Sequence, residues 1–396
     1  MISNSTGTRA CHFMKNVVAI RADHAKQAED FLKSRQVSSK SQRLDDSQLV
    51  RLMGKETDRE ILSQIHDLVA VFRVQGDLHE LARGLRDEVG IDASPVHALG
   101  SLSHIQSMTG TDPKPTRVKT EPVTAASSPG RVVAAIDTGV TTSLPAWLDS
   151  GLEYETADIE TLSGKNKASH GTFVAGLIRR TAPEHTISMT RARRWSVKDL
   201  GPKLETSHLD ADDPSTELHV LEAMIRLVNR LRDRSCDVAA LNLSLGGSCD
   251  DHDPGFATLR IALDLWRNSF PKVPIFAAGG NTPDTLEVYP GGFEFVRSVA
   301  AARDGGEQVV WDRTSSRSGP LTAPDRHWIT DVAPGSDLVS PSGRTRTEWV
   351  KWSGSSFATA VATASYVSNR PMEASDGLIW WADRQTKAAD IPGLVL

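Results

Sequence analysis

The stretch that most constrains this chain is an uncharged run of small residues in its C-terminal part. From Phe357 to Val367 the only polar residues are Thr, Ser and Tyr. A helix that is apolar on every face is a buried helix. Ser355 and Ser356 stand directly before this run, so the helix is expected to begin at a serine, where the free N–H groups of the first turn attract negative charge. Such a serine either caps a core helix or attacks a carbonyl group whose oxyanion its own N–H stabilises.

Two other segments favour a catalytic serine, because they supply the side chains that such a serine needs. An apolar run ends in Asp137 and is followed by a glycine turn. His170 stands at the start of a second apolar helix of small residues. The chain order Asp137, His170, Ser356 is one of the known orders for an acyl-transfer triad. The three segments therefore favour nucleophilic catalysis by a serine.

These three segments resemble the signature blocks of the subtilisin-like serine proteases, or subtilases. The chain reads Ile-Asp137-Thr-Gly, His170-Gly-Thr-Phe-Val-Ala-Gly and Gly-Ser-Ser356-Phe-Ala. The resemblance implies that Ser356 is the nucleophile, that His170 is first general base and then general acid, and that Asp137 orients the histidine. Ser353 and Ser355 are the competing nucleophiles, and the alignment places Ser355 where the family usually has threonine.

A fourth segment, Ala-Ala-Gly-Gly-Asn281, resembles the Ala-Gly-Asn block of the family. The resemblance implies that the side-chain amide of Asn281 donates a hydrogen bond to the developing oxyanion, together with the backbone N–H of Ser356. The alternative is an asparagine that only serves a turn.

Further residues are assigned to substrate binding by resemblance alone. The Ser-Leu-Gly segment of the family pairs with the substrate backbone as an added strand and forms one wall of the first specificity pocket. In this chain the segment is Ser244, Leu245 and Gly246, and the opposite wall would be formed by Gly279 and Gly280.

No metal ligand and no cofactor is predicted. Subtilases bind calcium in loops, but this sequence does not allow calcium ligands to be assigned. Asp210, Asp212 and Asp213 lie close together. They are explained more simply as carboxylates that cap the following helix.

Charge, cysteine content and the lack of long apolar segments indicate which partners and which cellular compartment to expect. The formal net charge of the 396 residues is −5, which gives no reason to expect nucleic acid as a partner. The three cysteines, Cys11, Cys236 and Cys249, are few and odd in number, so free thiols are favoured, although a bridge between the last two stays open. The N-terminal residues lack the apolar core of a secretory signal, and no run is long enough to cross a membrane. The expected location is therefore the cytoplasm, without membrane contact.

The predicted fold class is α/β, with a subtilisin-like parallel sheet that has helices on both faces, preceded by a small α/β sandwich domain. Residues 1–106 form this small domain, with Asp23 and Asp77 as helix caps. Residues 107–130 are rich in Thr, Pro, Ser and Lys and are interpreted as a linker. Residues 131–396 alternate short apolar runs with helical stretches, which is typical of a parallel sheet. Its expected elements are a strand and a helix, followed by a strand, a helix and a strand. By this order and its position the small domain resembles the inhibitory pro-domain of many subtilases, and an unrelated partner-binding domain is the alternative.

The predicted function is that of a serine endopeptidase that cleaves polypeptides through an acyl-enzyme. Two alternatives use the same residues. The first is a catalytically silent protein of the same fold that binds extended peptides, and the second is an esterase or amidase that acts on small molecules.

Overall fold

The computed structural model describes residues 13–35, 42–53, 57–101, 111–117, 131–162, 168–192, 215–248, 255–283, 285–303, 307–311, 320–324 and 326–369. The chain divides into two compact units. The first comprises Met1–Gly100, Ala192–Arg234 and Gly247–Lys272, and the second comprises Ser101–Arg191, Ser235–Gly246 and Val273–Leu396. Both units are thus assembled from segments that are distant in sequence. The domain boundaries after residues 106 and 130 stay a prediction.

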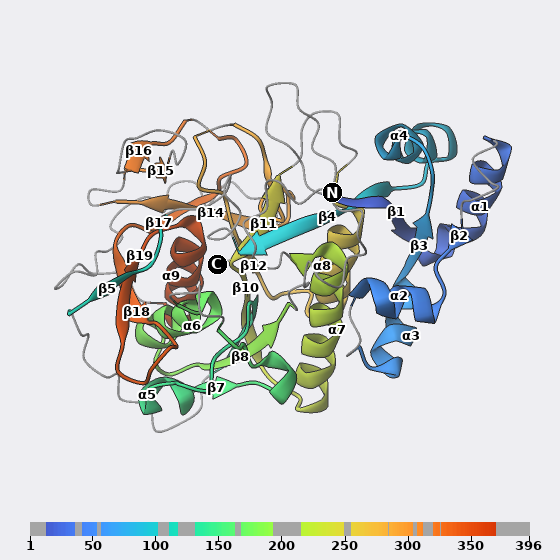
Figure 1. Ribbon diagram of the computed structural model, residues 1–396. Helices are drawn as coiled ribbons and strands as arrows, with labels where there is room; N and C mark the ends of the chain where they lie inside the picture. Colours follow the sequence, from blue (N-terminus) through green and yellow to red (C-terminus); the bar gives the residue numbers. More distant parts are fainter. Residues whose placement is uncertain are drawn as a thin grey trace. The chain divides into compact units, whose positions relative to one another are not determined.

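The first unit contains an antiparallel sheet in the order β4-β1-β3-β2 (Figure 1). The strands are β1 (Phe13–Arg21), β2 (Gln42–Arg43), β3 (Val69–Arg73) and β4 (Ala93–Ser101), and β9 (Ser215–Thr216) also pairs with β4. The predicted order of a strand and a helix, then strand, helix and strand, is confirmed by β1-α1 and β3-α4-β4, in which the helices are α1 (Ala25–Ser34) and α4 (Leu78–Val89).

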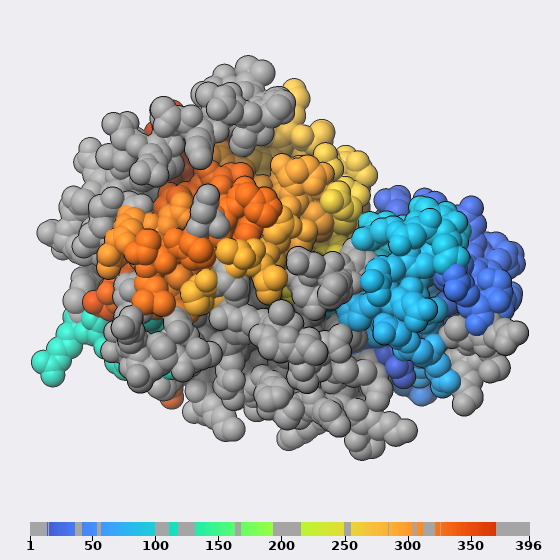
Figure 2. Space-filling model, turned by 90° about the horizontal axis from the view of Figure 1, so that it is seen from above, coloured from blue at the N-terminus to red at the C-terminus, as the bar shows by residue number. Residues whose placement is uncertain are grey.

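Helices α1 and α4 cover one face of this sheet. Their buried residues recur at helical spacing, as in Ala25, Ala28, Phe31 and Leu32, and they join Val18, Ile20, Ala70 and Phe72 of the strands in one apolar cluster. The outer surfaces of these two helices are seen in blue and cyan in Figure 2. The other helices of the unit are η1 (Ala22–His24), α2 (Asp46–Met53), α3 (Arg59–Leu68), α7 (Glu217–Asp233) and α8 (Ala257–Ser269).

The two predicted helix caps have different outcomes. The side chain of Asp77 accepts hydrogen bonds from the N–H groups of His79 and Glu80, so it caps α4 as predicted. The prediction for Asp23 is wrong, because this residue lies inside the 3₁₀ turn η1, and His24 precedes α1 without a capping side chain. The prediction that the N-terminal domain inhibits the enzyme or binds a partner stays a prediction.

The second unit is built on a parallel sheet in the order β17-β14-β12-β10-β6-β8-β7. The strands are β6 (Val132–Asp137), β7 (Leu152–Glu153), β8 (Thr186–Arg191), β10 (Val238–Leu243), β12 (Ile275–Ala278), β14 (Arg297–Ala302) and β17 (Asp331–Pro334). Every residue of β6, β10 and β12 is buried. Continuous apolar runs of this kind form strands that are covered on both faces. The predicted α/β class with a subtilisin-like parallel sheet flanked by helices is therefore confirmed.

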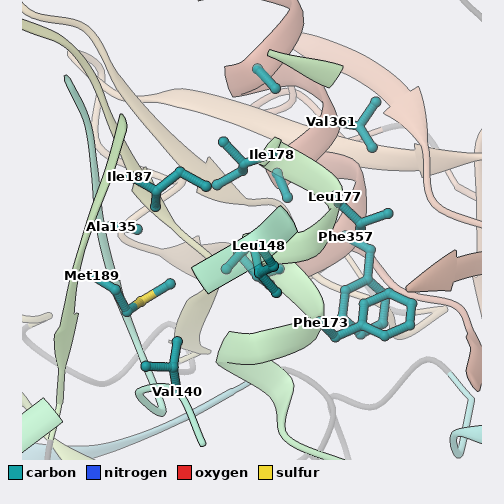
Figure 3. Close-up of a cluster of buried hydrophobic side chains, with 14 of the residues drawn as sticks. Ala135, Val140, Leu148, Phe173, Leu177, Ile178, Ile187, Met189, Phe357 and Val361 are labelled. Atoms are coloured by element: carbon teal, nitrogen blue, oxygen red, sulfur yellow. The ribbon is translucent and has the colours of Figure 1, made fainter. Parts of the chain in front are cut away.

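Helices α6 (His170–Thr181) and α9 (Ser355–Ser368) pack against each other and on this sheet. Their side chains form a dry cluster with residues of β6 and β8, in which Phe173 and Phe357 lie in contact (Figure 3). This packing fixes the first turns of α6 and α9 beside the sheet, and these turns carry His170 and Ser356.

Shorter elements complete the second unit. They are α5 (Ala146–Asp149), η3 (Thr156–Asp158), β13 (Val288–Tyr289), the pair β15 (Val309–Trp311) and β16 (Pro320–Thr322), and the antiparallel sheet of β18 (Leu338–Pro341), β19 (Trp349–Trp352) and β5 (Lys114–Thr116). Strand β11 (Leu245–Ser248) begins in the second unit and ends in the first. Strand β5 lies inside the segment interpreted as a linker, and it pairs with β19. None of the helices in the described ranges is long and apolar enough to cross a membrane.

Candidate active site

The centre of the site is a contact between Asp137 and His170. Asp137 is the last residue of β6, and His170 is the first residue of α6. The Nδ1 atom of His170 lies 2.7 Å from Oδ1 of Asp137, and both side chains are completely buried. The same carboxylate oxygen accepts the N–H of Thr138 at 2.7 Å. A carboxylate held in this way fixes the imidazole with Nδ1–H toward Asp137 and leaves Nε2 as the basic atom.

Two glycines allow close backbone contacts of the turn after Asp137, one with the helix that bears His170 and the other with Asp158. A Cβ atom on Gly171 would lie 2.1 Å from the carbonyl oxygen of Gly139. Gly139 itself has a φ of +91°, and a Cβ atom there would lie 2.3 Å from the carbonyl oxygen of Asp158. A side chain on Gly171 would push the helix away from this turn, and one on Gly139 would push the turn away from Asp158. The backbone around the Asp137–His170 contact therefore requires glycine at both positions.

Ser356 lies in the first turn of α9, next to residues that touch the histidine. The ring of Phe357, which follows Ser356, has its centroid 5.2 Å from that of His170, and the Trp352 ring lies edge-on to the imidazole at 5.6 Å. The hydroxyl of Ser356 donates to the carbonyl oxygen of Ser244 at 3.0 Å, and the Ser244 hydroxyl donates to the carbonyl oxygen of Ser356 at 2.7 Å. These contacts bring the start of α9 to the end of β10 and to the histidine.

The two competing serines have different surroundings. The hydroxyl of Ser355 accepts the N–H of Gly280 at 3.2 Å, and that of Ser353 accepts the N–H of Asp337 at 2.8 Å. Each of these hydroxyls thus holds a neighbouring loop by accepting one backbone N–H.

Asn281 stands after β12, and its amide orientation is defined by one hydrogen bond. The Oδ1 atom accepts the N–H of Ser355 at 2.6 Å, which identifies the other atom of the amide as the donor Nδ2. A Cβ atom on Gly354 would lie 3.6 Å from this Nδ2. The amide is buried and lies at the N-terminus of α9, where free N–H groups favour negative charge.

The parallel strands explain why these residues meet. Asp137 ends β6, Ser244 follows β10 directly, and Asn281 comes shortly after β12. These three strands are neighbours and run parallel. Their carboxyl ends therefore meet at one edge of the sheet.

Two of the three glycines predicted to form the walls of a substrate pocket face the same side chain, that of Val288. A Cβ atom on Gly246 would lie 2.9 Å from Cγ1 of Val288, and a Cβ atom on Gly280 would lie 2.7 Å from its Cγ2. The position of a Cβ atom on Gly279 is instead 2.3 Å from Cδ1 of Ile329. Val288 could not be predicted as a site residue from the sequence, because a single valine after a polar loop belongs to no motif or hydrophobic repeat.

A buried glutamate was also missed. Glu160 follows η3, and its Oε2 accepts hydrogen bonds from the hydroxyls of Thr138 and Ser169, which are neighbours of Asp137 and His170.

In the described ranges, no group of three or more His, Cys, Asp or Glu side chains could hold a metal ion. Asp210, Asp212 and Asp213 lie outside the described residues.

Comparisons with known proteins give a match to one family model and to several solved structures. A family model described as the subtilase family matches residues 128–388. Among solved structures, the prenylagaramide maturation protease PagA is 19% identical, with a TM-score of 0.42, over 60% of this chain and 74% of its own. Sphericase is 20% identical, with a TM-score of 0.40, over 62% and 79%. A lanthipeptide protease is 16% identical, with a TM-score of 0.39, over 60% and 72%. No match was found among curated proteins.

Proposed function

Because the chain belongs to the subtilase family of serine proteases, we propose that it is an endopeptidase that cleaves polypeptides through an acyl-enzyme. The observation that carries the proposal is the 2.7 Å contact between buried Asp137 and His170, beside the helix N-terminus that bears Ser356. A histidine with its tautomer fixed next to a serine at a helix start is the arrangement that acyl transfer requires.

In the proposed reaction the Ser356 hydroxyl gives its proton to Nε2 of His170 as Oγ attacks the substrate carbonyl. Asp137 accepts the Nδ1–H throughout and stabilises the imidazolium that forms. The tetrahedral oxyanion receives hydrogen bonds from the N–H of Ser356 and from Nδ2 of Asn281. The imidazolium then gives its proton to the leaving amine. Water, deprotonated by His170, attacks the acyl-enzyme and releases Ser356.

The extended part of the substrate is proposed to pair with Ser244, Leu245 and Gly246. Main-chain pairing of this kind gives affinity for polypeptides with little demand on their sequence. It also favours a peptidase over an esterase, because a small ester would gain nothing from the added strand.

The purified protein should digest casein, and a fluorophosphonate probe should label it at Ser356, as read by mass spectrometry of the labelled peptide. A protein that binds casein peptides but takes no label would instead be a catalytically silent binding protein. Labelling with hydrolysis of simple esters, but not of casein, would identify an esterase or amidase.

The site also leads to a prediction about the side chain on the acyl side of the cleaved bond. The two methyl groups of Val288 lie against Gly246 and Gly280, the glycines proposed as opposite walls of the pocket for that side chain. They occupy the space that a long side chain would need. We therefore expect the enzyme to prefer Gly, Ala or Ser at this position.

Val288→Gly should open the pocket and shift this preference toward Leu and Phe. Each methylene that a pocket admits or rejects changes selectivity by roughly 10- to 200-fold. The ratio of kcat/KM for matched Phe and Ala peptides should accordingly rise at least about 10-fold. The ratio within one variant is its own control for the amount of active enzyme. A wild type that already prefers Phe, or an unchanged ratio in the variant, would show that Val288 does not close the pocket.

A further inference from the structure

Glu160 is a buried carboxylate behind the Asp137–His170 pair. It is 4% exposed, and its Oε2 accepts hydrogen bonds from the Thr138 hydroxyl at 3.0 Å and from the Ser169 hydroxyl at 2.6 Å. Burying a carboxylate is unfavourable unless hydrogen bonds replace its hydration. The position of Glu160 between the two catalytic segments therefore calls for an explanation beyond packing.

Each of the two hydroxyls also accepts a backbone N–H next to a catalytic residue. The Thr138 hydroxyl accepts the N–H of Gly171 at 3.0 Å, and the N–H of Thr138 itself donates to Oδ1 of Asp137 at 2.7 Å. The Ser169 hydroxyl accepts the N–H of Thr172 at 3.1 Å and so caps α6 directly before His170.

The carboxylate determines the direction of both hydroxyls. A hydroxyl has one proton and two lone pairs. Because Glu160 takes the proton of each, the lone pairs of Thr138 and Ser169 are presented to the backbone amides of α6. The turn after Asp137 and the first turn of the helix that begins at His170 are thereby tied to one oxygen atom.

We propose that Glu160 is a positioning residue for catalysis, which keeps Asp137 and His170 at the distance and orientation that proton transfer needs. The inference rests on the proposed peptidase function. Glu160 acts through Thr138 and Ser169, and it acts by accepting hydrogen bonds. Both hydrogen bonds end on Oε2. The side-chain carbonyl oxygen of a glutamine at this position can therefore accept both of them. A misplacement of about 1 Å in a catalytic group can cost roughly 100-fold in rate.

The test compares Glu160→Ala and Glu160→Gln with the wild-type full chain. Each kcat is divided by the number of active sites, which is counted from the end point of fluorophosphonate labelling. Glu160→Ala should lower kcat about 10- to 100-fold, with KM changed less than about threefold, because the substrate does not touch the glutamate. Glu160→Gln should keep kcat within about threefold of the wild type.

Asp158→Asn is the matched control. Asp158 is also buried, belongs to the same loop, and accepts the N–H groups of Arg191 and Glu155 at 2.9 and 3.0 Å. A general loosening of this loop would lower the melting temperature of the control and of Glu160→Ala alike. Only a positioning role lowers kcat per active site in Glu160→Ala while leaving the control near the wild-type value.

Thr138→Val provides a second route if Glu160→Ala does not fold. Valine keeps the shape of threonine but removes the hydroxyl through which Glu160 acts, so kcat per site should fall by a similar factor. Unchanged kcat per site in Glu160→Ala or in Thr138→Val, or an equal loss in Asp158→Asn, would overturn the inference. A Glu160→Gln variant as slow as Glu160→Ala would also overturn it, because the negative charge would then be what matters. A wild type without peptidase activity would defeat the proposed function instead.

Discussion

Ser356→Ala should abolish casein hydrolysis and fluorophosphonate labelling, with a loss in kcat of about 10⁶, the order known for subtilisin, from which the value is taken. The change removes the only atom that can form the acyl-enzyme in the proposed mechanism. Ser356 is buried, and its hydroxyl donates to Ser244, so one lost hydrogen bond should lower the free energy of unfolding by only about 1 kcal/mol. The measurements are single-turnover kinetics and thermal unfolding of both proteins.

His170→Ala and Asp137→Ala should also be nearly inactive, because the three residues act as one unit. For this reason the double variant Ser356→Ala/His170→Ala should be no slower than Ser356→Ala alone. His170→Ala has an additional cost, since it leaves the buried carboxylate of Asp137 without its imidazole partner. Its folding must therefore be verified before its activity is interpreted.

The matched control for the nucleophile is Ser355→Ala. Ser355 is also buried in the first turn of α9, but its hydroxyl accepts the N–H of Gly280. We expect this variant to keep most of its activity. An inactive Ser355→Ala together with an active Ser356→Ala would mean that the nucleophile was assigned to the wrong serine.

Much of the fold could be predicted because local patterns and tertiary packing agree in it. The buried strands β6, β10 and β12 read as largely apolar runs, and each leads to a residue of the candidate site, such as Asp137 at the end of β6. The uncharged helix α9 is buried from Ser355 to Val361, as its composition indicates, whereas Tyr366 in its last turn is exposed. In these segments one sequence signal determines both the element and its depth in the core.

The failures concern residues whose role depends on distant segments. Asp23 is a good capping residue, but it lies inside a 3₁₀ turn, one residue before the N-cap position of α1, which His24 occupies. Strand β5 was not expected in a segment with the composition of a linker, and it pairs with β19, which is distant in sequence. The roles of Glu160 and Val288 depend on contacts with residues that are distant in sequence. Neither role could therefore be recognised from the neighbouring residues in the sequence.

Asn281→Ala should lower kcat by about 10² to 10³ with little change in KM, because the proposed hydrogen bond from Nδ2 forms mainly with the oxyanion of the transition state. This magnitude is again borrowed from subtilisin. The side chain has a second task in the structure, since its Oδ1 accepts the N–H of Ser355 at 2.6 Å. Alanine removes both the donor and the acceptor, so the alanine variant alone cannot separate catalysis from support of the α9 N-terminus.

Asn281→Asp separates the two tasks. Aspartate keeps the shape of the side chain and an oxygen for the N–H of Ser355, but it replaces the donor Nδ2 with an acceptor that repels an oxyanion. If the donor matters, Asn281→Asp should be at least as slow as Asn281→Ala while retaining more of the wild-type melting temperature. If the only task of Asn281 is to hold the start of α9, aspartate should restore kcat. Recovery of activity in Asn281→Asp would therefore remove this residue from the oxyanion hole and leave the N–H of Ser356 as its remaining proposed donor.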